Sequence, residues 1–474
     1  MKRVGFRQSW RPALVVTSVL KTGRKMSGEQ TALPKSDGPR LSIANRLRER
    51  LFGGAAGNVF RGMVVLATGS IAARAVGLLS IPVLTRIYGP EDFGVLAVFT
   101  ALVAMLVPVL TLRYVMAVPL PRHDGMAMNI MVLSGALMIA MALVVGLMLW
   151  AFGPALLGAM SMDVLAPWWW LIVLGLVGTG TYEVLSMWAT RRRAYKQIAR
   201  TQFSQGLWGA AVKITLGLLA LKPLGLLFGQ IAAQSGGIGS LGRNFWREFR
   251  ANARFVNMVR LRFAARRYRD FPVYRLPSQF LLVFSMQSPL LFTAMLYGAE
   301  TAGQLGLAIM ALTMPLALIT DVTGKAYFAE IAKVGKRDPK TVHAITIDTM
   351  KKMTVMAVPV ASVAFILGPW LFVFVFGEQW LLAGEFARIL SVQLFFLIVA
   401  RPVVQVMAVY DINRMYFIVN ILRAFMILSG FLLSSYLSYA SLDFVMLYSI
   451  SMAAYYIFML SLISYITKSR AVKE

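Results

Sequence analysis

Five charged side chains lie inside long hydrophobic stretches of the sequence: Arg74, Lys213, Arg401, Arg423 and Glu183. Four of the five are cations, and an arginine at the centre of a bilayer-spanning helix costs about 2.5 to 3.5 kcal/mol on insertion scales. Residues of this kind usually face a polar interior rather than lipid. Several cations with few carboxylates predict an anion-binding cavity. Arginine favours phosphate, because its planar fork donates paired hydrogen bonds.

The predicted cavity limits the chemistry of its ligand. A substrate that crosses lipid and also carries phosphates and a large polar group is a polyprenyl-pyrophosphate-linked glycan. We therefore expect Arg74, Lys213, Arg401 and Arg423 to line one cavity and to hold the pyrophosphate. Arg74 lies roughly 18 Å along the first predicted spanning helix, deep in the membrane.

Several of these residues also have a structural alternative. Arg401 and Arg423 lie close enough to the cytoplasmic ends of their helices to snorkel toward the surface. Glu183 either couples a proton or neutralises a neighbouring cation near the inner surface. Asp321 and Lys325, spaced i and i+4, predict a local ion pair.

The composition requires membrane-spanning helices to position these residues. The chain has 474 residues, of which 58% are hydrophobic and 14% charged, and this excludes a soluble globular protein. It has no cysteine, and its two histidines, His123 and His343, lie in predicted loops, so we expect neither a metal site nor a cofactor. Twelve spans are predicted: 62–84, 93–112, 128–151, 166–188, 203–221, 224–241, 276–297, 303–325, 353–376, 384–409, 415–436 and 442–466.

The loops between the spans differ sharply in charge. Connections 189–202, 242–275 and 325–352 are rich in Lys and Arg, while 153–166 and 437–443 contain neither. Because basic loops stay in the cytoplasm, both termini are predicted to be cytoplasmic. The net charge of +28 therefore reports topology, and no nucleic-acid partner is expected.

An internal repeat divides the chain. Tyr88-Gly89-Pro90-Glu91-Asp92-Phe93-Gly94-Val95-Leu96 matches Tyr297-Gly298-Ala299-Glu300-Thr301-Ala302-Gly303-Gln304-Leu305, which gives the pattern Y-G-x-E-x-x-G-x-L twice. With six spans in each half, the copies enter the membrane in the same direction. The prediction is an all-α polytopic membrane protein with about 12 helices, in two parallel-repeat six-helix bundles around a central cavity.

The predicted domains follow from this division. A basic cytoplasmic tail occupies 1–60, where 41–52 forms either a short amphipathic helix or plain solvated chain, and Met26 is an alternative start. The N-terminal bundle covers 61–241 and the C-terminal bundle 276–467, followed by a short tail over 468–474. Between the bundles, 242–275 is a basic linker, expected to form a helix on the inner surface or to gather anionic lipid headgroups.

Four motifs carry a resemblance to a known family. They are Leu84-Thr85-Arg86-Ile87-Tyr88-Gly89-Pro90-Glu91-Asp92-Phe93-Gly94, Leu112-Arg113-Tyr114-Val115-Met116-Ala117-Val118-Pro119-Leu120-Pro121, Tyr268-Arg269-Asp270-Phe271-Pro272-Val273-Tyr274, and Phe376-Gly377-Glu378-Gln379-Trp380 with Ala383-Gly384. Through them, 60–465 resembles the polysaccharide or O-antigen exporters, the lipid-linked oligosaccharide flippases of the multidrug/oligosaccharidyl-lipid/polysaccharide superfamily, which is MATE-like.

The resemblance implies two bundles, a V-shaped cavity and alternating access, in a bacterial inner (plasma) membrane. It also implies that the substrate is an undecaprenyl-pyrophosphate-linked repeat unit, moved from the inner to the outer leaflet for exopolysaccharide, capsule or O-antigen export. Membrane lipids, a polysaccharide polymerase and the export machinery are the further partners. The sequence departs from the family at Val115, where an acid is typical, and at Arg401, where a small residue usually precedes Pro402.

Two other functions remain as alternatives. A multidrug antiporter of the same superfamily would be expected to place carboxylates in the cavity to hold cationic drugs and the coupling ion. A glycan polymerase or ligase would need a large outer loop with catalytic groups. The sequence favours a transporter over an enzyme, because its uncharged-side loops are short and no G-x-x-x-x-G-K-S/T loop for nucleotides occurs in it.

Overall fold

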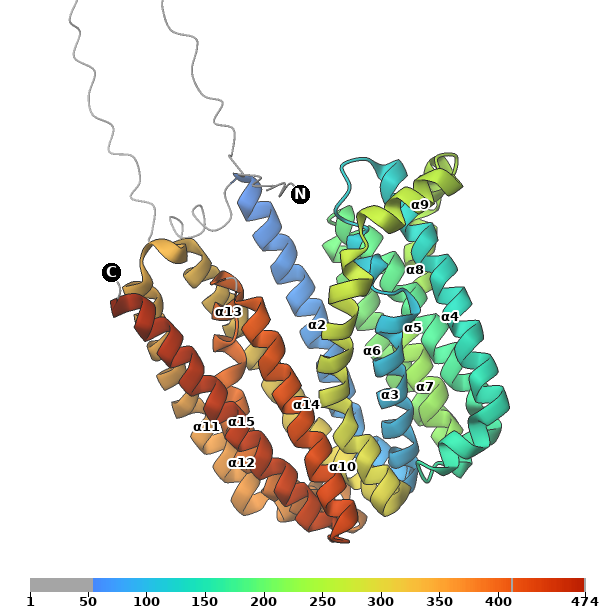
Figure 1. The fold of residues 1–474 in the computed structure, drawn as a ribbon. Helices are drawn as coiled ribbons and strands as arrows, with labels where there is room; N and C mark the ends of the chain where they lie inside the picture. Colours follow the sequence, from blue (N-terminus) through green and yellow to red (C-terminus); the bar gives the residue numbers. More distant parts are fainter. Residues whose placement is uncertain (1–53, 411, 473–474) are drawn as a thin grey trace, which may run out of the picture.

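The computed structural model describes residues 54–410 and 412–472, and these are overwhelmingly α-helical (Figure 1). The first half contains α2 (Gly54–Ile87), α3 (Pro90–Leu110), α4 (Asp124–Gly158), α5 (Trp169–Arg191), α6 (Tyr195–Leu218) and α7 (Leu224–Ser235). The second half contains α10 (Leu276–Val334), α11 (Pro339–Phe376), α12 (Leu381–Val403), the short α13 (Val406–Val409), α14 (Asn413–Tyr436) and α15 (Ser441–Val472).

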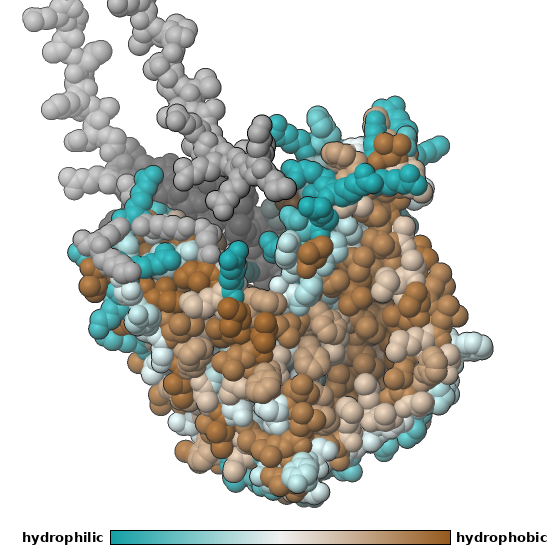
Figure 2. All heavy atoms as spheres, viewed as in Figure 1, coloured by the Kyte–Doolittle hydropathy of each residue, from teal (hydrophilic) through white to brown (hydrophobic). Residues whose placement is uncertain are grey.

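The apolar composition of these helices makes the chain a multi-pass membrane protein. Within the described residues, nine helices are long and apolar enough to cross a membrane. Of the helices named above, α6 and α7 fall outside this group, because α6 is more polar and α7 has only 12 residues. Apolar side chains also dominate the surface at the level of the helices, and polar ones gather at the two ends (Figure 2). The predicted fold class is confirmed.

Helix α10 is two spans joined by a sharp turn. Gly298 interrupts its 59 residues with φ of +84°, a conformation that side chains with a Cβ rarely adopt. The two limbs then pack against each other, since a Cβ placed on Gly306 would lie 3.6 Å from Cδ2 of Leu290. The limbs 276–297 and 299–334 thus correspond to the seventh and eighth predicted spans.

The two halves form separate bundles that meet at one end. In Figure 1 the bundle containing α3 to α7 and the bundle containing α11 to α15 lie side by side, with α2 and part of α10 between them. Their ribbons converge at the end where α10 turns and diverge toward the end that carries α9. The beginning of α2 and the end of α15 both lie at this diverging end.

The repeated motif makes the contact at the converging end. A Cβ on Gly94 would collide with the carbonyl of Ala299, and a Cβ on Gly303 with the carbonyl of Pro90. Ala299 occupies the position in the second copy that Pro90 occupies in the first, so the two contacts are reciprocal, as across a local two-fold axis. Since α3 and the second limb of α10 both leave this end in the same direction, the repeat is parallel.

The motif that contains Gln379 and Trp380 also stabilises the converging end. Nε2 of Gln379 and Nε1 of Trp380 both donate to the carbonyl of Thr85, at 2.7 and 3.2 Å. Trp380 is fully buried and packs edge-on against Phe93, with ring centroids 5.0 Å apart. The first and fourth of the motifs on which the resemblance rests therefore join the two halves to each other.

The linker contains two amphipathic helices, α8 (Ile238–Ala253) and α9 (Met258–Arg267). Leu241 and Phe245 of α8 are buried against the first bundle, while Arg243, Arg247 and Arg250 are exposed. These arginines thus occupy the outer face of an amphipathic helix.

The helix ends differ from the predicted ones at several places. The sixth span ends at Ser235 and not at 241, because Gly236 and Gly237 break the helix, the latter with φ of +101°. The last helix continues to Val472, past the predicted start of the tail at 468, and α2 already begins at Gly54. The predicted amphipathic helix over 41–52 lies outside the described residues.

Candidate anion-binding site between the two halves

Two of the four predicted cations converge on a single carboxylate. Nη1 of Arg74 lies 3.1 Å from Oδ2 of Asp321, and Nη2 of Arg401 lies 3.1 Å from Oδ1 of the same residue. The three side chains, here called the Asp321 triad, retain 42%, 33% and 39% of their surface exposed for Arg74, Asp321 and Arg401. The triad is therefore a solvent-accessible cluster with two positive charges and one negative charge.

The triad joins the two halves of the protein. Arg74 belongs to α2 in the first half, Asp321 to the second limb of α10, and Arg401 to the last turn of α12 before Pro402. The Arg74–Asp321 contact spans 247 residues of sequence. Arg74 lies 13 residues before the end of α2 at the converging end, or about 20 Å along the helix axis. The Arg74–Asp321 ion pair thus lies far from the converging end.

The geometry suits exchange of one anion for another. Each arginine contacts Asp321 through one terminal nitrogen, so each retains N–H donors that the carboxylate does not use. A phosphate group has more acceptor oxygens than a carboxylate, and arginine forks bind such oxygens in pairs. The triad can therefore accept a phosphate next to Asp321 or in its place.

The structure corrects the prediction made for Asp321 and Lys325. Both carboxylate oxygens of Asp321 are engaged by arginines, and among the described residues Lys325 forms no ion pair with it. Lys325 is instead exposed on the second limb of α10. The i,i+4 spacing predicted a local pair, but two arginines from other helices compete more effectively for the same carboxylate.

Lys213 lies elsewhere, inside the first bundle. Its Nζ donates to Oε1 of Gln230 on α7 at 2.7 Å, and its backbone carbonyl accepts a hydrogen bond of 2.7 Å from the Tyr88 hydroxyl. These contacts join the packed pair α6 and α7 and the end of α2. The structure does not bring Lys213 to the Asp321 triad.

Arg423 lies at the middle of α14, in the second bundle. Its guanidinium carbon is 5.7 Å from the ring centroid of Tyr455 on α15. The structure therefore places Arg423 among aromatic side chains and not with Arg74 and Arg401.

Glu183 forms an ion pair with Arg113, a residue of the second family motif. Oε1 of Glu183 lies 3.1 Å from Nη1 of Arg113, and the two side chains are 19% and 15% exposed. This contact corresponds to the neutralising alternative for Glu183. Arg113 was not among the predicted site residues, although its position in an Arg-Tyr motif beside a span was the available signal.

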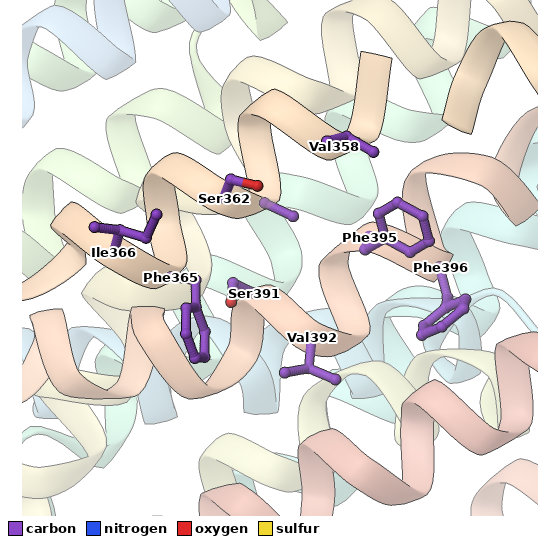
Figure 3. Close-up of a pocket in the computed structure, with 9 residues that line it drawn as sticks. Val358, Ser362, Phe365, Ile366, Ser391, Val392, Phe395 and Phe396 are labelled. Carbon is purple, nitrogen blue, oxygen red and sulfur yellow. The ribbon is translucent and has the colours of Figure 1, made fainter. Parts of the chain in front are cut away.

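A groove on the second bundle lies between α11 and α12 (Figure 3). It has a volume of about 440 Å³ and is lined by apolar side chains with two serines: Val358, Ala361, Ser362, Phe365, Ile366, Ser391, Val392, Phe395 and Phe396. None of the predicted site residues lines it. Without a charged group it suits hydrocarbon and not phosphate.

Comparison with known proteins gives one family. A family model described as "Polysaccharide biosynthesis protein" matches residues 83–384, more than half of the chain. No curated protein matches the sequence.

Solved structures share the fold at low identity. The lipid II flippase MurJ in an inward closed conformation superposes with a TM-score of 0.62 at 12% identity, over 85% of this chain and 90% of that one. An inward-facing multidrug resistance transporter of the MATE family, in the MOP superfamily, gives 0.52 at 15% identity, over 90% and 98%. A mutant of the Vibrio cholerae MATE transporter VcmN gives 0.51 at 11%, over 88% and 96%. These similarities establish the architecture alone.

Proposed function

Because the chain belongs to the family of polysaccharide biosynthesis proteins, we propose that it is a flippase for polyprenyl-pyrophosphate-linked oligosaccharides. The family match confirms the resemblance inferred from the sequence motifs. The fold shared with the lipid II flippase MurJ and with MATE transporters supports a transport function over an enzymatic one.

The observation that carries the proposal is the convergence of Arg74 and Arg401 on Asp321. A membrane protein bears the cost of two arginines at span depth when they face a polar path. Here they come from opposite halves, so one anion bound between them would contact both bundles at once. The polyprenyl chain would stay in lipid while the pyrophosphate and glycan occupy the space between the bundles.

The transport cycle depends on exchange between the Asp321 carboxylate and the pyrophosphate at the two arginines. With no substrate bound, Asp321 neutralises the two arginines and ties α2 to α10 and α12. An incoming pyrophosphate accepts hydrogen bonds from the arginines and displaces the carboxylate, which turns toward water. When the bundles rock about their converging contacts, the pyrophosphate leaves and Asp321 binds the arginines again. The carboxylate thus keeps substrate binding reversible, since two free arginines would hold the pyrophosphate too tightly.

The direction of transport follows from the orientation of the chain. The diverging end carries the start of α2, the end of α15 and the basic linker helix α9, and basic segments stay in the cytoplasm (Figure 1). We therefore place this end at the inner face of a bacterial inner membrane, with both termini cytoplasmic. The substrate would enter from the inner leaflet, and released glycan would pass to polymerase and export machinery outside.

The test is translocation by the purified protein. Proteoliposomes containing a fluorescent polyprenyl-pyrophosphate oligosaccharide are treated with an impermeant quencher, and the protected fraction is followed over time. The proposal expects the protein to equilibrate the lipid between leaflets and not to move a cationic dye. Transport of the dye without the glycolipid would instead establish a multidrug antiporter, and elongation of the glycan would establish a polymerase.

A further inference from the structure

The second bundle contains a membrane-embedded arginine with no acidic partner. Arg423 lies 10 residues from the start of α14, about 15 Å along the helix. Among the described residues, no Asp or Glu forms an ion pair with it, and its Nε is buried without a hydrogen-bond partner. An unpaired charge at this depth is costly, so a role in binding has to be considered.

The surroundings of Arg423 are tyrosines. The guanidinium carbon lies 5.7 Å from the ring centroid of Tyr455, and the ring of Tyr456 packs edge-on against that of Tyr455, with centroids 5.2 Å apart. Tyr416 lies two helical turns before Arg423 on α14, and Tyr448 lies two turns before Tyr455 on α15. This set of five residues is called the Arg423 cluster. Tyr455 is only 4% exposed, whereas the other four members are partly exposed. The cluster thus offers a guanidinium, hydroxyl groups and aromatic faces, none of them neutralised by a carboxylate.

The cluster lies deeper than the Asp321 triad. Arg401 lies two residues, or about 3 Å, before the end of α12, whereas Arg423 lies about 15 Å into α14, which begins ten residues after α12 ends. A ligand whose pyrophosphate is held at the triad would therefore extend its attached glycan toward the cluster.

We infer that the Arg423 cluster is a second anion site, which binds the carboxylate of an acidic sugar in the transported glycan. This inference rests on the proposed function for the source of the sugar. The guanidinium fork pairs with a carboxylate, the tyrosine rings pack against the C–H faces of a pyranose, and the tyrosine hydroxyls bind its hydroxyl groups. The Asp321 triad lacks aromatic faces, so phosphate and sugar acid are recognised at separate places.

The test uses soluble probes on full-length protein in lipid nanodiscs. Calorimetric titrations compare a glucuronic acid trisaccharide, the matched neutral glucose trisaccharide and inorganic pyrophosphate. Wild type is expected to bind the acidic trisaccharide about tenfold or more tightly than the neutral one. Arg423→Gln should remove this preference and leave pyrophosphate affinity within about twofold, while Arg423→Lys should keep part of it. Arg74→Gln should weaken pyrophosphate binding and keep the preference.

Several results would overturn the inference. They are equal binding of acidic and neutral trisaccharides by wild type, an unchanged preference in Arg423→Gln, and loss of pyrophosphate binding alone in that variant. If Arg423→Gln does not fold, the wild-type comparison and Arg423→Lys decide. Pyrophosphate binding without acidic-sugar binding would refute this site and leave the flippase proposal standing. Acidic-sugar binding without pyrophosphate binding would refute the flippase proposal and leave the acidic-sugar site standing.

Discussion

Replacing Asp321 with asparagine should make the protein bind pyrophosphate more tightly. In the wild type an incoming anion has to displace the carboxylate from Arg74 and Arg401. Both contacts are 3.1 Å long and between residues that are about one-third to two-fifths exposed. Ion pairs of this exposure are worth about 0.2 to 1 kcal/mol each, because solvent screens them. Removing the competitor should thus free about 0.4 to 2 kcal/mol, or about a 2- to 30-fold lower Kd.

The assay is calorimetric titration of a short-chain isoprenyl pyrophosphate into the protein in nanodiscs. A matched control exists on α12, where Arg388 and Glu385 form an ion pair with the same 3.1 Å distance and the same exposures of 42% and 33%. That pair lies within one helix, so Glu385→Gln should leave the affinity unchanged. The gain in Asp321→Asn should also shrink at high salt.

The reasoning fails if Asp321→Asn binds the pyrophosphate no more tightly than wild type while its thermal unfolding midpoint is unchanged. A weaker affinity would mean that Asp321 positions the arginines for the ligand and does not compete with it. An equal gain in Glu385→Gln would trace the effect to net charge and not to the triad.

Three further predictions concern the framework. Gly94→Ala should destabilise the protein by about 1 to 3 kcal/mol in thermal unfolding, because the added Cβ meets the carbonyl of Ala299. Gly77→Ala is the control, because the space around its Cβ is open, and equal effects of the two substitutions would disprove the close contact. Arg113→Gln should cost about 3 to 5 kcal/mol by leaving Glu183 unpaired, and adding Glu183→Gln should recover most of it, an outcome that a non-interacting pair would not give. A single cysteine introduced into this cysteine-free chain at 161 should react with an impermeant thiol reagent from outside the cell, and one in α9 should not; the opposite pattern would invert the topology and the direction of transport.

The sequence was sufficient to predict the architecture where the pattern repeats. The two Y-G-x-E-x-x-G-x-L copies predicted a duplication, and Gly94 and Gly303 indeed meet at equivalent positions. Twelve apolar stretches corresponded to twelve helical segments once the turn at Gly298 is counted. Hydropathy and repeat spacing are local properties, so they can be read without knowledge of tertiary contacts.

The candidate site depended on contacts that local pattern does not encode. Arg74 and Arg401 were identified from charge at span depth, but their shared partner Asp321 is 247 residues from Arg74, and only the i,i+4 neighbour was visible in the sequence. Likewise, the 210-residue offset between Lys213 and Arg423 suggested a common cavity. Lys213 instead pairs with Gln230 in its own bundle, because helix rotation, which sequence depth does not specify, decides which way a side chain points.

The central claim is that Arg74 and Arg401 hold the pyrophosphate during translocation. Its most direct test is the initial translocation rate of a fluorescent polyprenyl-pyrophosphate oligosaccharide in proteoliposomes containing wild type, Arg74→Ala or Arg74→Lys at equal protein density. Charge-assisted hydrogen bonds contribute about 1.5 to 3 kcal/mol, so Arg74→Ala should slow translocation on the order of 10- to 100-fold. Arg74→Lys should recover part of the rate, since charge returns without the bidentate fork. Translocation by Arg74→Ala at the wild-type rate would contradict the account.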